Sequence, residues 1–252
     1  MTSPLEQLRR DGILVVPGLG PQQLREFRAA LDAHAVYGSH VAAKSPEPPV
    51  PLARALAERR WPACAPPMAA TVLAPHWFEY ALGYFAAARE YFDGEFPRLY
   101  SINSFWTLPQ EGVLYQDTQA WHRDGDDRRQ LTLFMLGTPV PEPSEGAHLY
   151  QRGTHRVPDA ELGRPFREPP PLGVTEVVCG PAGTTMLVDT GGLHKAVRPA
   201  TVPRLLVWAR WGVSNPPASY GWDQLSPVPA AEMGGRYPAE PELREAVRLV
   251  VA

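Results

Sequence analysis

The residues best suited to bind a metal ion lie in the short segment Trp121-His122-Arg123-Asp124-Gly125. On a strand, residues i and i+2 project from the same face, so His122 and Asp124 can direct an imidazole nitrogen and a carboxylate oxygen to one point. A distant third ligand is available in His194, which follows the apolar run 185–188. Two histidines and one carboxylate on one side of an octahedral ion leave three positions open, as in non-haem iron(II) sites that react with O₂.

An arginine strengthens this prediction, because a His-x-Asp pair alone also arises by chance in turns and surface ion pairs. Arg204 opens the β-rich run that follows His194. A guanidinium can form two parallel hydrogen bonds with a carboxylate, so Arg204 suits the distal carboxylate of 2-oxoglutarate while the keto-acid end chelates iron. Arg198 and Arg210 compete for this role, and Arg210 shares the strand alternation of Arg204, so spacing does not decide between them.

Further contacts are proposed from nearness to the metal motif and from side-chain chemistry. Gln119 and Thr132 are candidates for additional 2-oxoglutarate contacts. Trp106, Tyr115 and Trp208 are candidates for the wall of a substrate pocket, although aromatic residues on strands more often belong to the core.

Other polar residues near the metal-binding motif are predicted to have structural roles and not to bind the metal. Asp126 and Asp127 are expected to form a charged loop, and Asp189 to orient a turn or an imidazole behind the metal. The remaining histidines, among them His148, are expected to be structural or solvated, with His155 the strongest exception.

Short β-rich runs separated by turns and prolines must position these residues. An early strand is expected at 13–16, followed by a helix from Pro21 to about Ala35. The further strands are expected at 98–108, 130–136, 146–150, 175–178, 184–188 and 204–211, and the further helices at 52–60, 77–91 and 240–250. This order predicts a mainly β protein with flanking helices and a double-stranded β-helix core, which is a cupin-like jelly roll.

The 252 residues fit one domain spanning 1–252. We expect an N-terminal strand, helices and possible lid in 1–95, the jelly-roll core in 96–215 and a C-terminal extension in 216–252. The lid is placed in 38–67, because prolines interrupt that segment repeatedly.

Composition limits the classes of partner. A net charge of −3 gives no electrostatic reason to expect nucleic acid or an anionic membrane, so a small-molecule substrate is favoured. The N-terminus lacks a signal-peptide pattern, and no apolar run approaches the ~20 residues of a membrane helix, so we expect a cytoplasmic protein. The oligomeric state is left open.

Taken in order, several motifs resemble the phytanoyl-CoA dioxygenase family of iron(II)/2-oxoglutarate oxygenases. They are Asp11 to Leu19 with its following helix, Trp121 to Gly125, Glu145-Gly146-Ala147-His148, Gly153-Thr154-His155-Arg156, His194 and Arg204. Gly153 to Arg156 is similar to the family's Gly-Ser-His-Arg element, with threonine in place of serine.

The resemblance implies a double-stranded β-helix, Fe(II) bound by His122, Asp124 and His194, and 2-oxoglutarate anchored by Arg204. It implies an oxygenase that uses O₂, releases succinate and CO₂, and oxidises a C–H bond of a small molecule, which we place in biosynthesis. Retention of Asp124 favours oxygen transfer over halogenation, because related halogenases lack this carboxylate.

The outcome could be hydroxylation, desaturation, epoxidation or rearrangement. Two other classes are kept as alternatives. The first is a cupin-like metal-dependent dioxygenase or isomerase that does not use 2-oxoglutarate, for which Arg204 would have no purpose. The second is a jelly-roll binding protein without catalysis.

Overall fold

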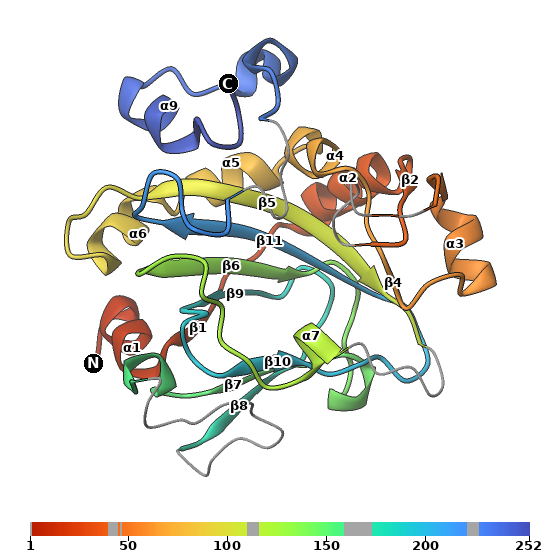
Figure 1. Ribbon diagram of the computed structural model, residues 1–252, viewed down its shortest axis with the longest axis horizontal. Coiled ribbons are helices and arrows are strands. Elements are labelled where there is room, and N and C mark those ends of the chain that lie inside the picture. The colour runs from red at the N-terminus through yellow and green to blue at the C-terminus, as the bar shows by residue number, and fades with distance from the viewer. Residues whose placement is uncertain (1, 40–44, 46, 110–115, 159–172, 221–226) are drawn as a thin grey trace.

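The computed structural model describes residues 2–39, 45, 47–109, 116–158, 173–220 and 227–252. Two antiparallel sheets face each other, with helices on the outer face of the larger one (Figure 1), which confirms the predicted jelly roll with flanking helices. The larger sheet has the order β1 (Ile13–Val16), β9 (Thr185–Val188), β6 (Gln130–Leu136), β11 (Arg204–Gly212), β5 (Arg98–Thr107) and β4 (Ala63–Cys64). The smaller sheet has the order β10 (His194–Ala196), β7 (His148–Gln151) and β8 (Thr175–Val178).

Helices α2, α4, α5 and α6 cover the larger sheet on the side away from the smaller one (Figure 1). The helical segments are α1 (Pro4–Asp11), α2 (Pro21–Asp32), α3 (Leu52–Glu58), α4 (Met68–Leu73), α5 (Trp77–Leu82), α6 (Phe85–Tyr91), α7 (Gln116–Gln119) and α9 (Pro241–Val247), with 3₁₀ turns η2 (Pro143–Glu145), η3 (Thr154–Arg156) and η4 (Ala230–Arg236). In the part of the chain that the structure describes, no helix is both long and apolar enough to cross a bilayer.

Side-chain alternation divides the interior into two cores. On β6 and β11, Leu133, Val207 and Trp211 point outward and pack in the cluster that includes the helices. Phe134 and Leu206 point inward, towards the smaller sheet. The even-numbered residues of these two strands therefore face the space between the sheets.

Several features differ from the predicted elements, and the short elements β2, β3, β4, α7 and β10 were not predicted. The helix expected over 77–91 is two helices, because the chain turns between Leu82 and Phe85. Helix α1 was not predicted, although Ser3 and Glu6 form a capping box at its start. Helix α4 was not predicted either.

Strand β2 (Ala35–Val36) lies just before the segment proposed as a lid, and β3 (Val50–Pro51), within that segment, pairs with β2. Helix α3 follows, and then β4 pairs with the edge of β5. Residues 40–44 and 46 lie outside the described residues. Closure of this segment over a pocket stays a prediction.

Candidate metal centre

His122 and His194 are brought together by the backbone. Each donates its N–H to the carbonyl oxygen of the other at 3.0 Å, so His122 extends the smaller sheet beside β10. Their rings lie 4.2 Å apart. Oδ1 of Asp124 lies 3.7 Å from Nε2 of His122 and 3.9 Å from Nε2 of His194. Ligand atoms of the three residues lie within 4.8 Å of one another, a separation that one metal ion can span.

Backbone carbonyls set the orientation of both imidazoles. Nδ1 of His122 lies 2.8 Å from the carbonyl oxygen of Ala120, and Nδ1 of His194 lies 2.9 Å from that of Gly192. Because only a protonated nitrogen can donate to a carbonyl, these contacts place the proton on Nδ1. Nε2 of each ring is then left with its lone pair for a metal.

Asp124 is held by its surroundings in the ionised form. Burial raises the pKa of Asp124, but the charge of the nearby Arg210 guanidinium, helped by His194 and His122 where they are protonated, outweighs burial, so the pKa of Asp124 lies below its usual value. Burial also lowers the pKa of His194 to about 4, which keeps its imidazole neutral at physiological pH. A carboxylate and a neutral imidazole are the forms that bind a metal.

Thr190 contacts Asp124, and Thr132 in turn contacts Thr190. The backbone N–H of Asp124 donates to the carbonyl of Thr190 at 2.9 Å, and the Thr190 side chain helps to lower the pKa of the Asp124 carboxyl. Thr132, a proposed 2-oxoglutarate contact, lies 3.4 Å from the Thr190 hydroxyl and is fully buried. Thr132 thus contacts Thr190, the neighbour of the metal-ligand candidate Asp124, and is not among the residues that line the cavity.

The motifs Asp11-Gly12 and Gly153-Thr154 meet at the turn before His194. The Thr154 hydroxyl accepts a hydrogen bond from the backbone N–H of Leu193 at 2.8 Å. The carbonyl of Gly12 accepts from the N–H of Asp189 at 2.8 Å, and the carbonyl of Asp11 accepts from the N–H of Gly153. The threonine hydroxyl therefore positions the residue next to His194.

Asp189 holds the same turn, as the sequence suggested. Its carboxylate accepts hydrogen bonds from the Tyr91 hydroxyl at 2.6 Å and from the N–H of Gly191 at 2.9 Å. His155, by contrast, is directed towards α1, with Nε2 lying 3.0 Å from the carbonyl oxygen of Arg9. It does not line the cavity at the metal ligands.

Arg204 is a buried cation with unused hydrogen-bonding capacity. The residue is 1% exposed, and its Nη1 donates to the carbonyl oxygen of Gly146 at 2.7 Å. Nε and Nη2 have no hydrogen-bond partner among the described residues. Burial lowers the pKa of Arg204 to about 10, so the side chain is still charged at neutral pH. A buried charge without a counter-ion is costly, so this environment favours an anionic ligand.

The competing arginines have different surroundings. Arg210 lies 3.0 Å from Asp126 and 3.8 Å from Asp124, so two carboxylates already neutralise its charge. Arg198 also has a buried Nη2 without a hydrogen-bond partner among the described residues, but it is only half-buried, in the connection between β10 and β11, whereas Arg204 is fully buried with two such nitrogens. Arg204 is therefore the best placed of the three to bind a carboxylate from outside the chain.

A cavity of about 390 Å³ opens beside the three metal-ligand candidates. Its apolar wall includes Phe105 and Trp208, whose rings pack edge to face with centroids 5.3 Å apart. Thr118, Asp126 and Arg210 also line it. An apolar wall combined with a few polar groups is typical of a small-molecule site.

Two other residues that were predicted at the site, Trp106 and Gln119, do not line the cavity. Trp106, contrary to expectation, lies on the opposite face of β5, packs in the core beneath the helices and lies 4.9 Å below the Arg28 guanidinium. Trp106 and Phe105 are consecutive residues on β5, so their side chains point to opposite faces, and Phe105 is the one that faces the cavity. Gln119 is half-buried in α7 and does not line the cavity, whereas the neighbouring Thr118 does. Tyr115 lies outside the described residues.

His148 lines the cavity, although the sequence suggested a structural or solvated role. It is 2% exposed, and its ring lies 5.7 Å from that of His194 and 5.2 Å from that of Phe134. Burial is the largest cause that lowers the pKa of His148 well below its usual value, and the charge of Arg204 lowers it further. Only the pairing of β7 with β10 reveals this position, and the sequence does not specify that pairing.

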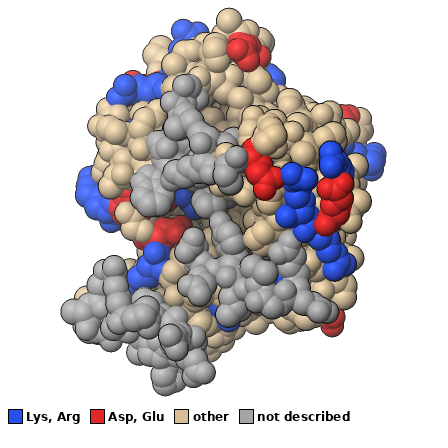
Figure 2. Space-filling view, turned by 45° about the vertical axis from the view of Figure 1, so that its right-hand side comes forward, with Lys and Arg blue, Asp and Glu red and all other residues tan. Residues whose placement is uncertain are grey.

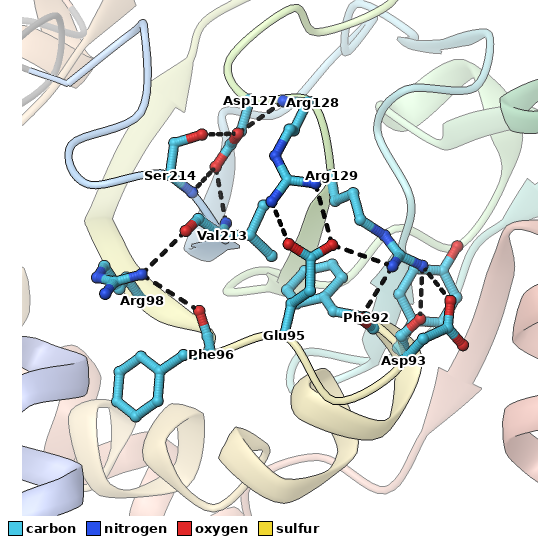
Figure 3. Close-up of polar contacts among 11 residues, drawn as sticks. Phe92, Asp93, Glu95, Phe96, Arg98, Asp127, Arg128, Arg129, Val213 and Ser214 are labelled. Atoms are coloured by element: carbon cyan, nitrogen blue, oxygen red, sulfur yellow. Dashed lines mark hydrogen bonds and ion pairs between the residues drawn. The ribbon is translucent and has the colours of Figure 1, made fainter.

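The loop after Asp124 is firmly anchored (Figure 3). Asp127 accepts hydrogen bonds from the backbone N–H groups of Val213 and Ser214 at 2.7 and 2.8 Å. Arg128 and Arg129 both contact Glu95. The segment is a charged loop, as expected, and in addition the contacts of Asp127 tie it to the end of β11.

Asp126 also points inward. It accepts a hydrogen bond from the Tyr100 hydroxyl at 3.0 Å and forms an ion pair with Arg210.

On the face shown in Figure 2, the described basic and acidic side chains are interspersed and form no large patch of one sign.

Comparisons with known proteins give a consistent fold. Neither a protein-family model nor a curated protein sequence matches the chain. Solved structures do match. One is the non-haem alpha-ketoglutarate-dependent epimerase SnoN from nogalamycin biosynthesis, with a TM-score of 0.57, 20% identity, and coverage of 82% of this chain and 81% of that chain.

Two further structures have similar values. HygX from Streptomyces hygroscopicus, solved with nickel, 2-oxoglutarate and hygromycin B, has a TM-score of 0.55, 18% identity, and coverage of 84% of this chain and 86% of that chain. The non-haem alpha-ketoglutarate-dependent carbocyclase SnoK has a TM-score of 0.54, 16% identity, and coverage of 82% of both chains. At these identities the similarity shows that this chain has the same fold as these enzymes.

Proposed function

We propose that this protein is an Fe(II)/2-oxoglutarate-dependent oxygenase of the phytanoyl-CoA dioxygenase type that hydroxylates, or otherwise oxidises, a C–H bond of a small organic molecule. The observation that carries the proposal is the charged, partly unpartnered guanidinium of Arg204. It projects from the same face of β11 as Leu206 and Trp208, which line the cavity beside His122, Asp124 and His194.

Each residue has a distinct role in this proposal. His122, Asp124 and His194 would hold the iron through two neutral imidazoles and one carboxylate. Arg204 would neutralise the distal carboxylate of 2-oxoglutarate, which places the keto acid towards the metal. When bound, iron and 2-oxoglutarate supply an oxidation by O₂ that releases succinate and CO₂.

The chain itself positions the reactants and excludes water. Phe105 and Trp208 offer an apolar wall to the substrate, and the Arg210–Asp126 pair contributes a polar edge. Holding a C–H bond beside the oxidising centre is the main task left to the protein. Asp124 favours oxygen transfer, because it keeps a carboxylate at a position that a halide would need.

A biosynthetic role is supported by two of the proteins with a similar fold. SnoN comes from nogalamycin biosynthesis, and HygX was solved with hygromycin B. We place the protein in the cytoplasm and assign it a small-molecule substrate rather than a nucleic acid or membrane.

The cupin-like alternative is less well supported, because it gives no purpose to the unpartnered donors of Arg204. A binding protein without catalysis would likewise not need a complete set of metal ligands beside a cavity.

The function is tested by O₂-dependent formation of succinate. Iron-loaded wild-type protein and Asp124→Ala are incubated with 2-oxoglutarate, with and without O₂, and succinate is quantified. We expect the wild type to form succinate only with iron and O₂, and Asp124→Ala to lose this activity. Wild-type protein that binds Fe(II) but neither binds nor consumes 2-oxoglutarate would overturn the proposal.

A further inference from the structure

His148 is a second buried donor beside this cavity. The residue lines the cavity and is 2% exposed. Its Nε2 is buried and has no hydrogen-bond partner in the described part of the chain. Since a buried polar atom without a partner carries a desolvation cost, this nitrogen is suited to a ligand that enters the cavity.

His148 and Arg204 belong to the same corner of the molecule. His148 begins β7, and Gly146, just before that strand, accepts the hydrogen bond from Nη1 of Arg204. The charge of Arg204 also contributes to the lowered pKa of His148. Two buried donors from different sheets therefore approach one region between the sheets.

The wall around His148 supplies little else to a polar ligand. In the register of the smaller sheet, His148 lies opposite Ala196. Ala196, Phe134 and Leu206 line the cavity and have no polar side-chain atom. The small Ala196 side chain leaves space in front of the imidazole, and His148 supplies a polar group that this part of the wall otherwise lacks.

We propose that His148 donates from Nε2 to the distal carboxylate of 2-oxoglutarate alongside Arg204, and so selects a dicarboxylic keto acid over one without the second carboxylate. The inference rests on the proposed function. An imidazole can present an N–H at Nε2 in either protonation state, so the contact does not depend on its titration. A hydrogen bond to a charged carboxylate is stronger than one between neutral groups, and it discriminates against a ligand that lacks the acceptor.

His148 is distinguished from a fourth metal ligand by its position. Among the described residues, the group whose ligand atoms converge within 4.8 Å contains only His122, Asp124 and His194. The inference therefore predicts that iron affinity does not depend on His148.

The test compares two keto acids with the same carbon chain. Dissociation constants for 2-oxoglutarate and for 2-oxopentanoate, which lacks the distal carboxylate, are measured anaerobically with the Fe(II)-loaded protein. The variants are His148→Phe, which removes the donor and retains a ring, and His148→Gln, which retains an N–H donor. Fe(II) affinity and the melting temperature of each variant are measured in parallel.

We expect His148→Phe to bind 2-oxoglutarate about tenfold more weakly, with binding of 2-oxopentanoate and Fe(II) unchanged. His148→Gln should recover part of the loss. Equal weakening for both keto acids, an unchanged preference, or a loss of Fe(II) affinity would overturn the role of His148 while leaving the proposed function intact. Failure of the Fe(II)-loaded wild type to bind 2-oxoglutarate would overturn both.

Discussion

Arg204 and Gly146 fit closely against each other. The guanidinium donates to the Gly146 carbonyl at 2.7 Å, and a Cβ added at Gly146 would lie 2.5 Å from Cδ of Arg204. Gly146 has a φ of +106°, which L-residues with side chains rarely adopt. The glycine of the Glu145-Gly146-Ala147-His148 motif therefore makes room for the proposed 2-oxoglutarate anchor.

Gly146→Ala should displace Arg204 and weaken 2-oxoglutarate binding by at least about tenfold, since loss of a charged hydrogen bond costs ~1.5–3 kcal/mol. The dissociation constant is measured anaerobically with Fe(II)-loaded protein. Gly94→Ala is the control, because Gly94 also has positive φ, at +88°, but a Cβ there meets nothing within 4 Å. The control should lose stability and retain affinity; equal losses of affinity in both variants would contradict the account.

Thr190→Val should weaken Fe(II) binding by about 10–100-fold, the usual effect of removing a group that orients a metal ligand. Thr190 is fully buried, its carbonyl accepts a hydrogen bond from the N–H of Asp124, and its side chain helps to lower the pKa of the Asp124 carboxyl. Thr185→Val is a matched control, because Thr185 is equally buried but donates to the carbonyl of Gly183. Fe(II) titration checks the difference, and a comparable loss in the control would mean that destabilisation alone explains it.

Glu95→Gln should lower the melting temperature at neutral pH. Contacts with Arg128 and Arg129 lower the pKa of Glu95 from its ordinary value of 4.5. Its ionised form therefore stabilises the folded protein above about that pH, and this contribution is lost as the pH falls through the lower folded-state pKa.

Melting curves of wild type and Glu95→Gln, recorded between neutral and acid pH, should converge at the acid end and also at high salt. Glu58→Gln, which removes exposed ion pairs with Arg54 and Arg60 at α3, serves as the control. A difference between wild type and Glu95→Gln that widens on acidification has the wrong sign for this explanation.

Much of the fold was predictable because strand and turn signals are local. The runs 130–136 and 175–178 form strands with those same bounds, since β-branched and apolar residues there are bounded by turns or polar segments. The three metal-ligand candidates could also be proposed from the sequence, because His122 and Asp124 have i, i+2 spacing and a jelly roll brings distant segments such as His194 together. The structure has only an isolated bridge at His122 in place of the expected strand. The role of these residues in binding iron stays a prediction.

The residues that line the cavity were harder to predict from the sequence, because they depend on which face of each strand points towards the space between the sheets. Trp106 and Trp208 both lie on strands with apolar residues on both faces, so alternation gives no preference. Helices on one side of the sheet decide that Trp106 is core and Trp208 lines the cavity. The contacts of Asp127 with the end of β11 and the position of His148 in the cavity wall likewise depend on segments that are far apart in the chain.

The most direct test of the central claim is anaerobic addition of Fe(II) and 2-oxoglutarate to metal-free protein, followed by visible absorption spectroscopy. The account predicts the weak charge-transfer band of an iron-chelated keto acid. His122→Ala should abolish the band, and Arg204→Ala should require much more 2-oxoglutarate to produce it. Wild-type protein that binds Fe(II) tightly but shows no band at saturating 2-oxoglutarate would contradict the account and favour a metal-dependent enzyme that does not use this keto acid.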